Sequence, residues 1–98
     1  MSRDDFPPRS TEERQRLIES TMRMILKAAT DAHMVMSADM RVGEKDAAKL
    51  IGYAAGSLKN LRQMGGAPIY YNRPVHGSRV SYRLMDLAAW LEERRQGW

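Results

Sequence analysis

Glycines at two places in the middle of this chain restrict it to short helices joined by tight turns. Gly52 and the Gly65-Gly66 pair end two segments of mixed apolar and polar residues, 44–51 and 55–64. Glycine is favoured just past a helix because it readily adopts the left-handed backbone found there. The pattern predicts two short helices separated by about three residues, which is the helix–turn–helix arrangement.

The segment that follows predicts a β-hairpin and a last helix. Residues 69–73 and 79–83 are rich in aromatic and β-branched side chains, and 74–78 between them has turn composition. Residues 85–93 have apolar positions at helical spacing, with Trp90 on the expected buried side. The fold class predicted is mainly α with a small β-hairpin, a winged helix–turn–helix over residues 41–95.

A long helix is predicted before this domain. Residues 1–9 are polar and contain a Pro-Pro pair, which favours a disordered arm. Ser10 followed by Glu13 is the capping-box spacing that begins a helix. The helix should run from about Thr11 to about Met34, within an N-terminal segment at 10–36, and residues 37–40 should form a linker.

One apolar stripe follows the length of this expected helix. Its members alternate four and three positions apart up to Met36, and the first four, which are the candidate oligomerisation residues, are Ile18, Met22, Ile25 and Ala29. The stripe can pack against the chain's own C-terminal domain, or it can form a self-association seam, since the spacing also fits a short coiled coil. We expect the helix to pack partly on its own domain and partly on a second copy of the chain. This predicts a homodimer through the helix.

Composition excludes several classes of protein. The chain has no cysteine, so neither a disulfide framework nor a thiolate metal site is expected. It has only two histidines, and no apolar run long enough for a signal peptide or a membrane span. No nucleophile–base pair or phosphate loop is present. We therefore expect a cytoplasmic protein that is not an enzyme and takes no cofactor or metal.

The charge of the chain is unevenly distributed. Residues 47–85 contain six Lys or Arg and no Asp or Glu, although the whole chain has a net charge of only +4. A zone of one sign creates a local positive potential that attracts polyanions. Since the zone covers the expected helix–turn–helix and hairpin, it predicts nucleic acid as the partner.

The outer face of the second short helix carries groups suited to reading DNA. With Leu58 and Leu61 directed inward, small and long hydrogen-bonding side chains face outward, and such side chains pair with base edges in the major groove. The candidate base-reading residues are Ser57, Lys59, Asn60, Arg62 and Gln63. The candidate backbone contacts on the hairpin and the preceding helix are Lys45, Lys49, Arg73, His76, Ser78 and Arg79.

These segments together resemble the small winged helix–turn–helix domains of the MerR superfamily, in particular the subgroup of AlpA-like regulators and phage excisionases. The resemblance lies in the runs at 46–52, 57–62, 66–70, 79–83 and 86–91, in the same order. It implies DNA binding through the helix containing Ser57, Lys59, Asn60 and Arg62, with Arg73 and Arg79 in the wing and Trp90 and Leu91 in the core. The chain departs from the pattern at Ala54, where a capping Ser is common, at Leu61, which replaces a frequent aromatic, and in a longer wing tip.

The function predicted from the sequence is sequence-specific binding of double-stranded DNA, as a transcriptional regulator or an excisionase-type recombination directionality factor of a phage or mobile element. Two alternatives remain open. One is a DNA-packaging subunit similar to small terminases. The other is a protein-interaction module, such as an anti-repressor, that keeps the fold without binding DNA.

Overall fold

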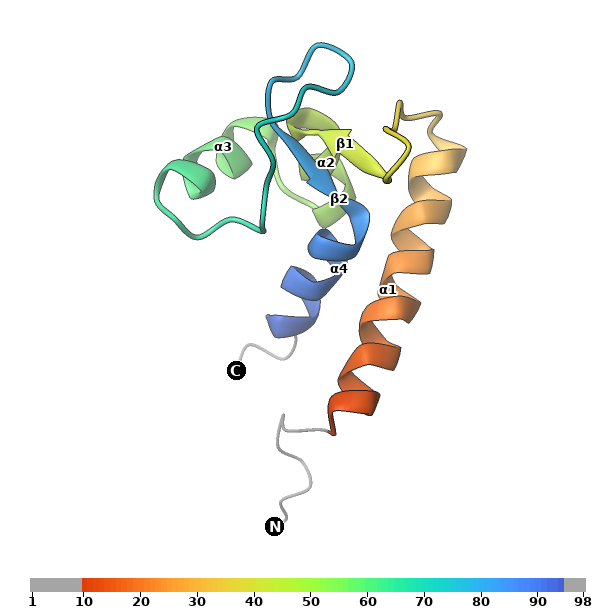
Figure 1. Cartoon of the computed structure of the whole chain (residues 1–98). Helices are drawn as coiled ribbons and strands as arrows, with labels where there is room; N and C mark the ends of the chain where they lie inside the picture. Colours follow the sequence, from red (N-terminus) through yellow and green to blue (C-terminus); the bar gives the residue numbers. More distant parts are fainter. Residues whose placement is uncertain (1–9, 95–98) are drawn as a thin grey trace.

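The computed structural model describes residues 10–94, which form four helices and two short strands. In chain order these are α1 (Thr11–Asp31), β1 (Arg41–Gly43), α2 (Glu44–Ile51), α3 (Ala55–Gln63), β2 (Ser81–Arg83) and α4 (Leu84–Glu93). Figure 1 shows α1 beside α4, with the strands, α2 and α3 grouped toward the end of the molecule where α1 finishes. The prediction of a mainly helical chain with a small antiparallel β element is confirmed.

The long first helix begins where the sequence predicts and packs on the last helix. The Ser10 hydroxyl accepts a hydrogen bond from the backbone N–H of Glu13 at 3.0 Å, which caps the start of α1. Ile25 and Ala29 are buried, and the Thr21 hydroxyl donates to the Glu92 carboxylate at 2.6 Å. The apolar stripe therefore joins α1 to α4 within one chain (Figure 1).

The end of α1 differs from the prediction. The helix stops at Asp31 and does not continue to about Met34 as expected. His33 has a positive φ of 56°, and the backbone N–H of Met34 bonds to the carbonyl of Ala29 at 3.0 Å. These are the features of a Schellman helix end, which usually has glycine at the left-handed position. A histidine there gives the sequence no visible stop signal.

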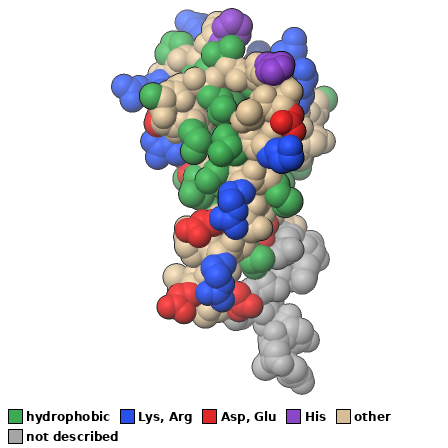
Figure 2. Space-filling view, turned by 90° about the vertical axis from the view of Figure 1, so that its right-hand side faces the viewer, with side chains coloured by type: hydrophobic (Ala, Val, Ile, Leu, Met, Phe, Trp, Pro, Cys, Tyr) green, Lys and Arg blue, Asp and Glu red, His purple; other side chains and the backbone are tan. Residues whose placement is uncertain are grey.

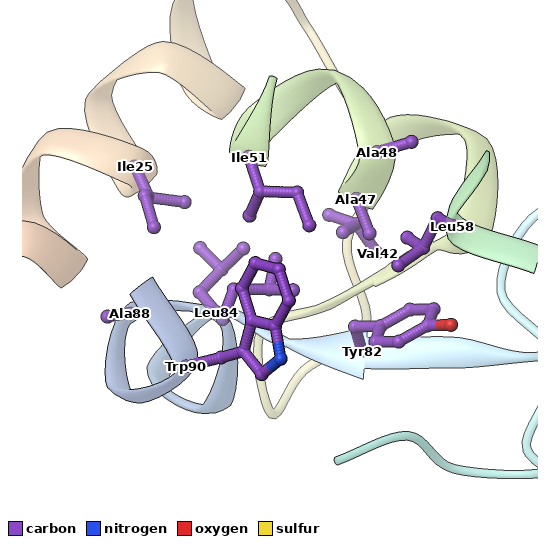
Figure 3. Packing of buried hydrophobic residues seen from close by; sticks show 11 residues of the cluster. Ile25, Val42, Ala47, Ala48, Ile51, Leu58, Tyr82, Leu84, Ala88 and Trp90 are labelled. Atoms are coloured by element: carbon purple, nitrogen blue, oxygen red, sulfur yellow. The ribbon is translucent and has the colours of Figure 1, made fainter. Parts of the chain in front are cut away.

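The core lies where all four helices and the two strands meet. Val42, Leu58 and Tyr82 have no exposed surface, and Trp90 is 6% exposed. Figure 3 shows Trp90 pointing into the same cluster as Ile51 and Leu84, to which α1 contributes Ile25. The Trp90 indole N–H donates to the Gly66 carbonyl at 3.2 Å, so its polar atom is paired as a buried donor must be. The core position expected for Trp90 is confirmed.

The strand pairing differs from the expected hairpin. β1 pairs with β2 in antiparallel register, with Arg41 opposite Arg83. Residues 69–73 contribute only one bridge to this sheet, between Tyr71 and Ser81. The Arg73 carbonyl takes no part in strand pairing and accepts from side chains, from the Arg41 guanidinium at 3.3 Å and from the Ser81 hydroxyl at 2.7 Å. The segment after α3 therefore continues as an irregular loop.

The two glycine signals mark helix ends as predicted. Gly52 ends α2 with a φ of 83°, and Gly65 follows α3 with a φ of 86°. In each case a backbone N–H just past the helix bonds back to a carbonyl of the helix, from Tyr53 to Ala48 and from Gly66 to Leu61. The two short helices are joined by residues 52–54, as the sequence indicated.

Candidate nucleic-acid interface

The outer face of α3 is polar and open to solvent. Leu58 is buried and Leu61 half-buried, as expected. Four of the predicted base-reading residues are exposed on this helix, namely Ser57, Lys59, Asn60 and Gln63. The N-cap of α3 is Ala54, which offers no side-chain hydrogen bond. The first turn of α3 therefore has no side-chain cap from that position, in line with the departure seen in the sequence.

The loop at residues 72–80 is closed at its tip by a two-residue turn. Val75 and Ser78 exchange backbone hydrogen bonds of 3.0 Å, and His76 and Gly77 between them have φ values of 45° and 85°. Two consecutive positive φ values are typical of a type I′ turn, which matches the twist of paired strands. His76 is exposed at this tip. Figure 1 shows the loop projecting from the end of the molecule opposite the start of α1.

An open hollow lies between α3 and this loop. Its lining includes Glu44, Lys59, Arg62, Asn72, Ser78 and Arg79. Lys59 and Arg79 are exposed, and neither forms an ion pair within residues 10–94. Two predicted contact residues from separate segments are thus brought to one surface, where an anionic backbone would meet both.

Unlike Lys59 and Arg79, Arg62 is held in an ion pair. Its Nε and Nη2 atoms donate to the two Glu44 carboxylate oxygens at 2.7 and 3.0 Å, and its guanidinium lies 5.6 Å from the centre of the Tyr70 ring. Its side chain is 19% exposed. The bidentate pair occupies the Nε–Nη2 edge of the guanidinium and holds the side chain against α2, away from the exposed face of α3. We therefore remove Arg62 from the set of proposed DNA contacts.

Ser78 also has a role inside the fold. Its hydroxyl accepts from the backbone N–H of Glu44 at 3.1 Å and donates to the Val80 carbonyl at 2.6 Å. It supplies the cap of α2 that the N-cap residue Gly43 cannot provide. A Cβ at Gly43 would lie 2.7 Å from the Ser78 Cβ, so the close approach requires glycine. We remove Ser78 from the proposed contacts for the same reason as Arg62.

The Glu44 carboxylate lines the hollow and accepts hydrogen bonds from Arg62 and Tyr82. The hydrogen bonds from Arg62 lower the pKa of the Glu44 carboxyl, with a further contribution from the Tyr82 hydroxyl, while burial opposes them. Burial, followed by the bond to Glu44, raises the pKa of Tyr82, which keeps that hydroxyl a neutral donor. The sequence did not single out Glu44, because its partners come from three segments distant along the chain.

The other predicted backbone contacts are exposed. Lys45 and Lys49 lie on the solvent side of α2, and the side chain of Arg73 lies at the start of the loop. Within residues 10–94 none of the three is held in an ion pair. They remain available to an anionic partner.

A second carboxylate–arginine cluster lies in the segment expected to be a linker. Asp39 accepts from Ser37 at 2.6 Å, from Arg41 at 2.9 Å and from Arg83 at 3.2 Å. The Ser37 hydroxyl and then the Arg41 guanidinium hold the pKa of Asp39 well below its usual range. Arg41 is buried, and the guanidinium carbons of Arg41 and Arg83 lie 5.9 and 5.3 Å from the centre of the Tyr71 ring. Residues 37–40 are therefore a fixed turn that introduces β1.

The predicted oligomerisation residues mostly pack within the core of the single chain. Ile25 is 5% and Ala29 0% exposed in the single chain, so they cannot form an intermolecular seam without opening the core. Ile18 and Met22 are half-buried against the same core. Figure 2 shows the α1 side, where hydrophobic side chains gather on the upper part and charged side chains alternate along the lower part. The most exposed large apolar residue of α1 is Met24, at 65%.

No cluster of three or more His, Cys, Asp or Glu residues that could hold a metal lies within the described part of the chain. None of the helices in residues 10–94 has both the length and the hydropathy needed to cross a membrane. Comparisons with protein-family models, curated proteins and solved structures found nothing significantly similar to this chain.

Proposed function

We propose that this chain is a sequence-specific, double-stranded DNA-binding protein without enzymatic activity. In this proposal α2 and α3 form a helix–turn–helix, α3 enters the major groove, and the loop at 72–80 acts as a wing on the backbone. The role would be that of a transcriptional regulator or an excisionase-type factor, as the resemblance to AlpA-like proteins of the MerR superfamily implies.

The observation that carries the proposal is the pair of free cations on either side of one hollow. Lys59 on α3 and Arg79 on the loop are exposed, and the one carboxylate that lines the hollow is already paired with Arg62. Asn60 and Gln63 are exposed on the same helix and can hydrogen-bond base edges. Cations that contact phosphates supply affinity, and the amides beside them supply discrimination.

The experiment is a binding titration with a duplex selected from a random pool, run at several salt concentrations. We expect Lys59→Ala and Arg79→Ala each to weaken binding and to reduce the salt slope by about one unit per lost phosphate contact. Asn60→Ala should instead reduce discrimination between sequences with little change in slope. Glu93→Ala, on the exposed end of α4, serves as the control. Wild-type protein that selects no sequence and binds no duplex at low salt would refute the proposal.

A protein-interaction module is the second candidate, and one observation favours it. Met64 is 81% and Ile69 64% exposed, next to the half-exposed Tyr70. Exposed apolar groups that form one patch can mark a protein contact, and these three lie within one seven-residue segment of the chain. This candidate predicts no DNA affinity even at low salt, so the same titration separates the two.

We also propose that two copies act together, because one small module buries only about 600–1,000 Å² on DNA. The contact would use the exposed side of α1 around Met24, since Ile25 and Ala29 lie in the core. Light scattering should give a dimer for the wild-type protein and a monomer for Met24→Glu. A wild-type protein that is monomeric at high micromolar concentration would contradict this.

A further inference from the structure

Glu44 joins all the elements that surround the hollow. Its carboxylate accepts two hydrogen bonds from Arg62 of α3 and one, at 2.6 Å, from Tyr82 of β2. Its backbone N–H donates to Ser78 of the loop. As the first residue of α2, it therefore fixes α3, β2 and the loop relative to that helix.

The pair that Glu44 forms also sets the charge of the surface. The Arg62 and Glu44 side chains are only 19% and 15% exposed, and their charges cancel at a contact of 2.7 Å. Tyr70 lies against the guanidinium and covers it further. The net positive charge of the hollow thus comes from Lys59 and Arg79 at its rim. Arg62 lines the same hollow, so it would add a third free cation there if the Glu44 charge were absent.

We infer that Glu44 is a specificity-determining residue. Its carboxylate keeps Arg62 in an ion pair, so that only Lys59 and Arg79 of the hollow attract the backbone of a polyanion. Phosphate contacts strengthen binding to every sequence alike and carry no sequence information. An additional free arginine would therefore raise non-specific affinity more than specific affinity. With DNA as the polyanion the inference rests on the proposed function, whereas its electrostatic part holds for any polyanion.

The test compares two substitutions that change the net charge equally. Glu44→Gln keeps the size of the side chain and removes its charge. Asp46→Asn does the same two residues along α2, at a side chain that does not line the hollow. Binding to a short random-sequence duplex and the salt needed for elution from heparin are measured for both. We expect Glu44→Gln to bind the duplex several-fold more tightly at low salt than Asp46→Asn, with a salt slope steeper by about 0.9 for the added contact.

A double variant keeps the inference testable if Glu44→Gln is unstable. Glu44→Gln with Arg62→Gln replaces the ion pair by two amides, a change that folded proteins often tolerate because the cost of desolvating both charges disappears. Since it removes one charge of each sign, we expect random-duplex affinity and salt slope equal to wild type. A clear loss of affinity in the double variant would show that Arg62 contacts phosphate in the wild-type protein, and would overturn the inference.

The outcomes separate this inference from the proposed function. Equal binding of Glu44→Gln and Asp46→Asn to duplex and to heparin overturns the inference, even if the wild-type protein selects a DNA site. Later elution of Glu44→Gln from heparin with no duplex binding by any variant supports the inference and refutes DNA binding. An absence of binding to both polyanions by every variant overturns both.

Discussion

The α1–α4 side and the α3–loop side of the molecule differ in what their side chains contact. On the first side, apolar residues such as Ile25 and Ala29 are used up by packing within the chain, and the Thr21 hydroxyl is paired with Glu92. On the second, Lys59 and Arg79 have no ion-pair partner within residues 10–94. A side whose groups are satisfied internally stabilises the fold, whereas a side with exposed, unpaired cations is free to bind.

The same distinction divides the arginines in and next to the acid-free stretch at residues 47–85. Arg41, Arg62 and Arg83 each donate to a carboxylate of their own chain. Arg73 and Arg79 have exposed side chains at the loop. A count of basic residues therefore overstates the charge that a partner would meet, and the carboxylates just outside the acid-free stretch account for the difference.

The largest effect should come from the α1–α4 side. We expect Ile25→Ala to reduce the free energy of unfolding by about 2–5 kcal/mol, because it removes a buried side chain and leaves a cavity. Thr30→Ala, at an exposed position near the end of the same helix, should change it by less than about 0.5 kcal/mol. Urea unfolding of the two variants measures both values. Equal destabilisation would show that α1 is turned differently from the arrangement described here.

The next effect concerns two cations one turn apart on α3. Arg62→Ala should cost about 1–3 kcal/mol of unfolding free energy, since it leaves the half-buried Glu44 carboxylate without its charged donor. Lys59→Ala should leave stability within about 0.5 kcal/mol of wild type, because its side chain is exposed. Chemical unfolding of each purified variant provides the comparison. If Lys59→Ala proved the more destabilising, the division between paired and free cations on α3 would not hold.

The smallest effect is a change with pH. The pKa of the Glu44 carboxyl is lowered from its ordinary value of 4.5, chiefly by Arg62. A carboxyl with a lower pKa in the folded state contributes stability above its unfolded pKa and loses that contribution as the pH falls through the folded pKa. We expect the unfolding free energy of the wild-type protein to decline as the pH falls below about 4.5. The decline should be more gradual in Glu44→Gln, which lacks this carboxyl.

Urea titrations over a series of acidic pH values measure this slope, with Asp46→Asn as the matched control. The pKa of Asp39 is also lowered, so part of the slope should persist in Glu44→Gln. Parallel curves for the wild-type protein and Glu44→Gln would contradict the role given to the Glu44–Arg62 pair.

The amino-acid sequence by itself determined the features that depend on neighbouring residues. The Ser10 cap, the turn after Gly52 and the inward side of α3 follow from hydrogen-bonding groups and helical spacing within a few positions. Trp90 was placed in the core for the same reason, because its helix has only one apolar side. Such interactions are visible in a single stretch of sequence.

Tertiary structure alone decided which groups are paired and which are free. The partner of β2 is β1, about forty positions earlier by the Arg41–Arg83 register, and the partner of Arg62 is Glu44 across the turn between α2 and α3. The end of α1 depends on a left-handed His33 that no residue type announces. Pairing over such distances depends on how the helices pack in space, which periodicity and composition do not encode. The same pairing determines how much charge is left exposed on the α3–loop surface.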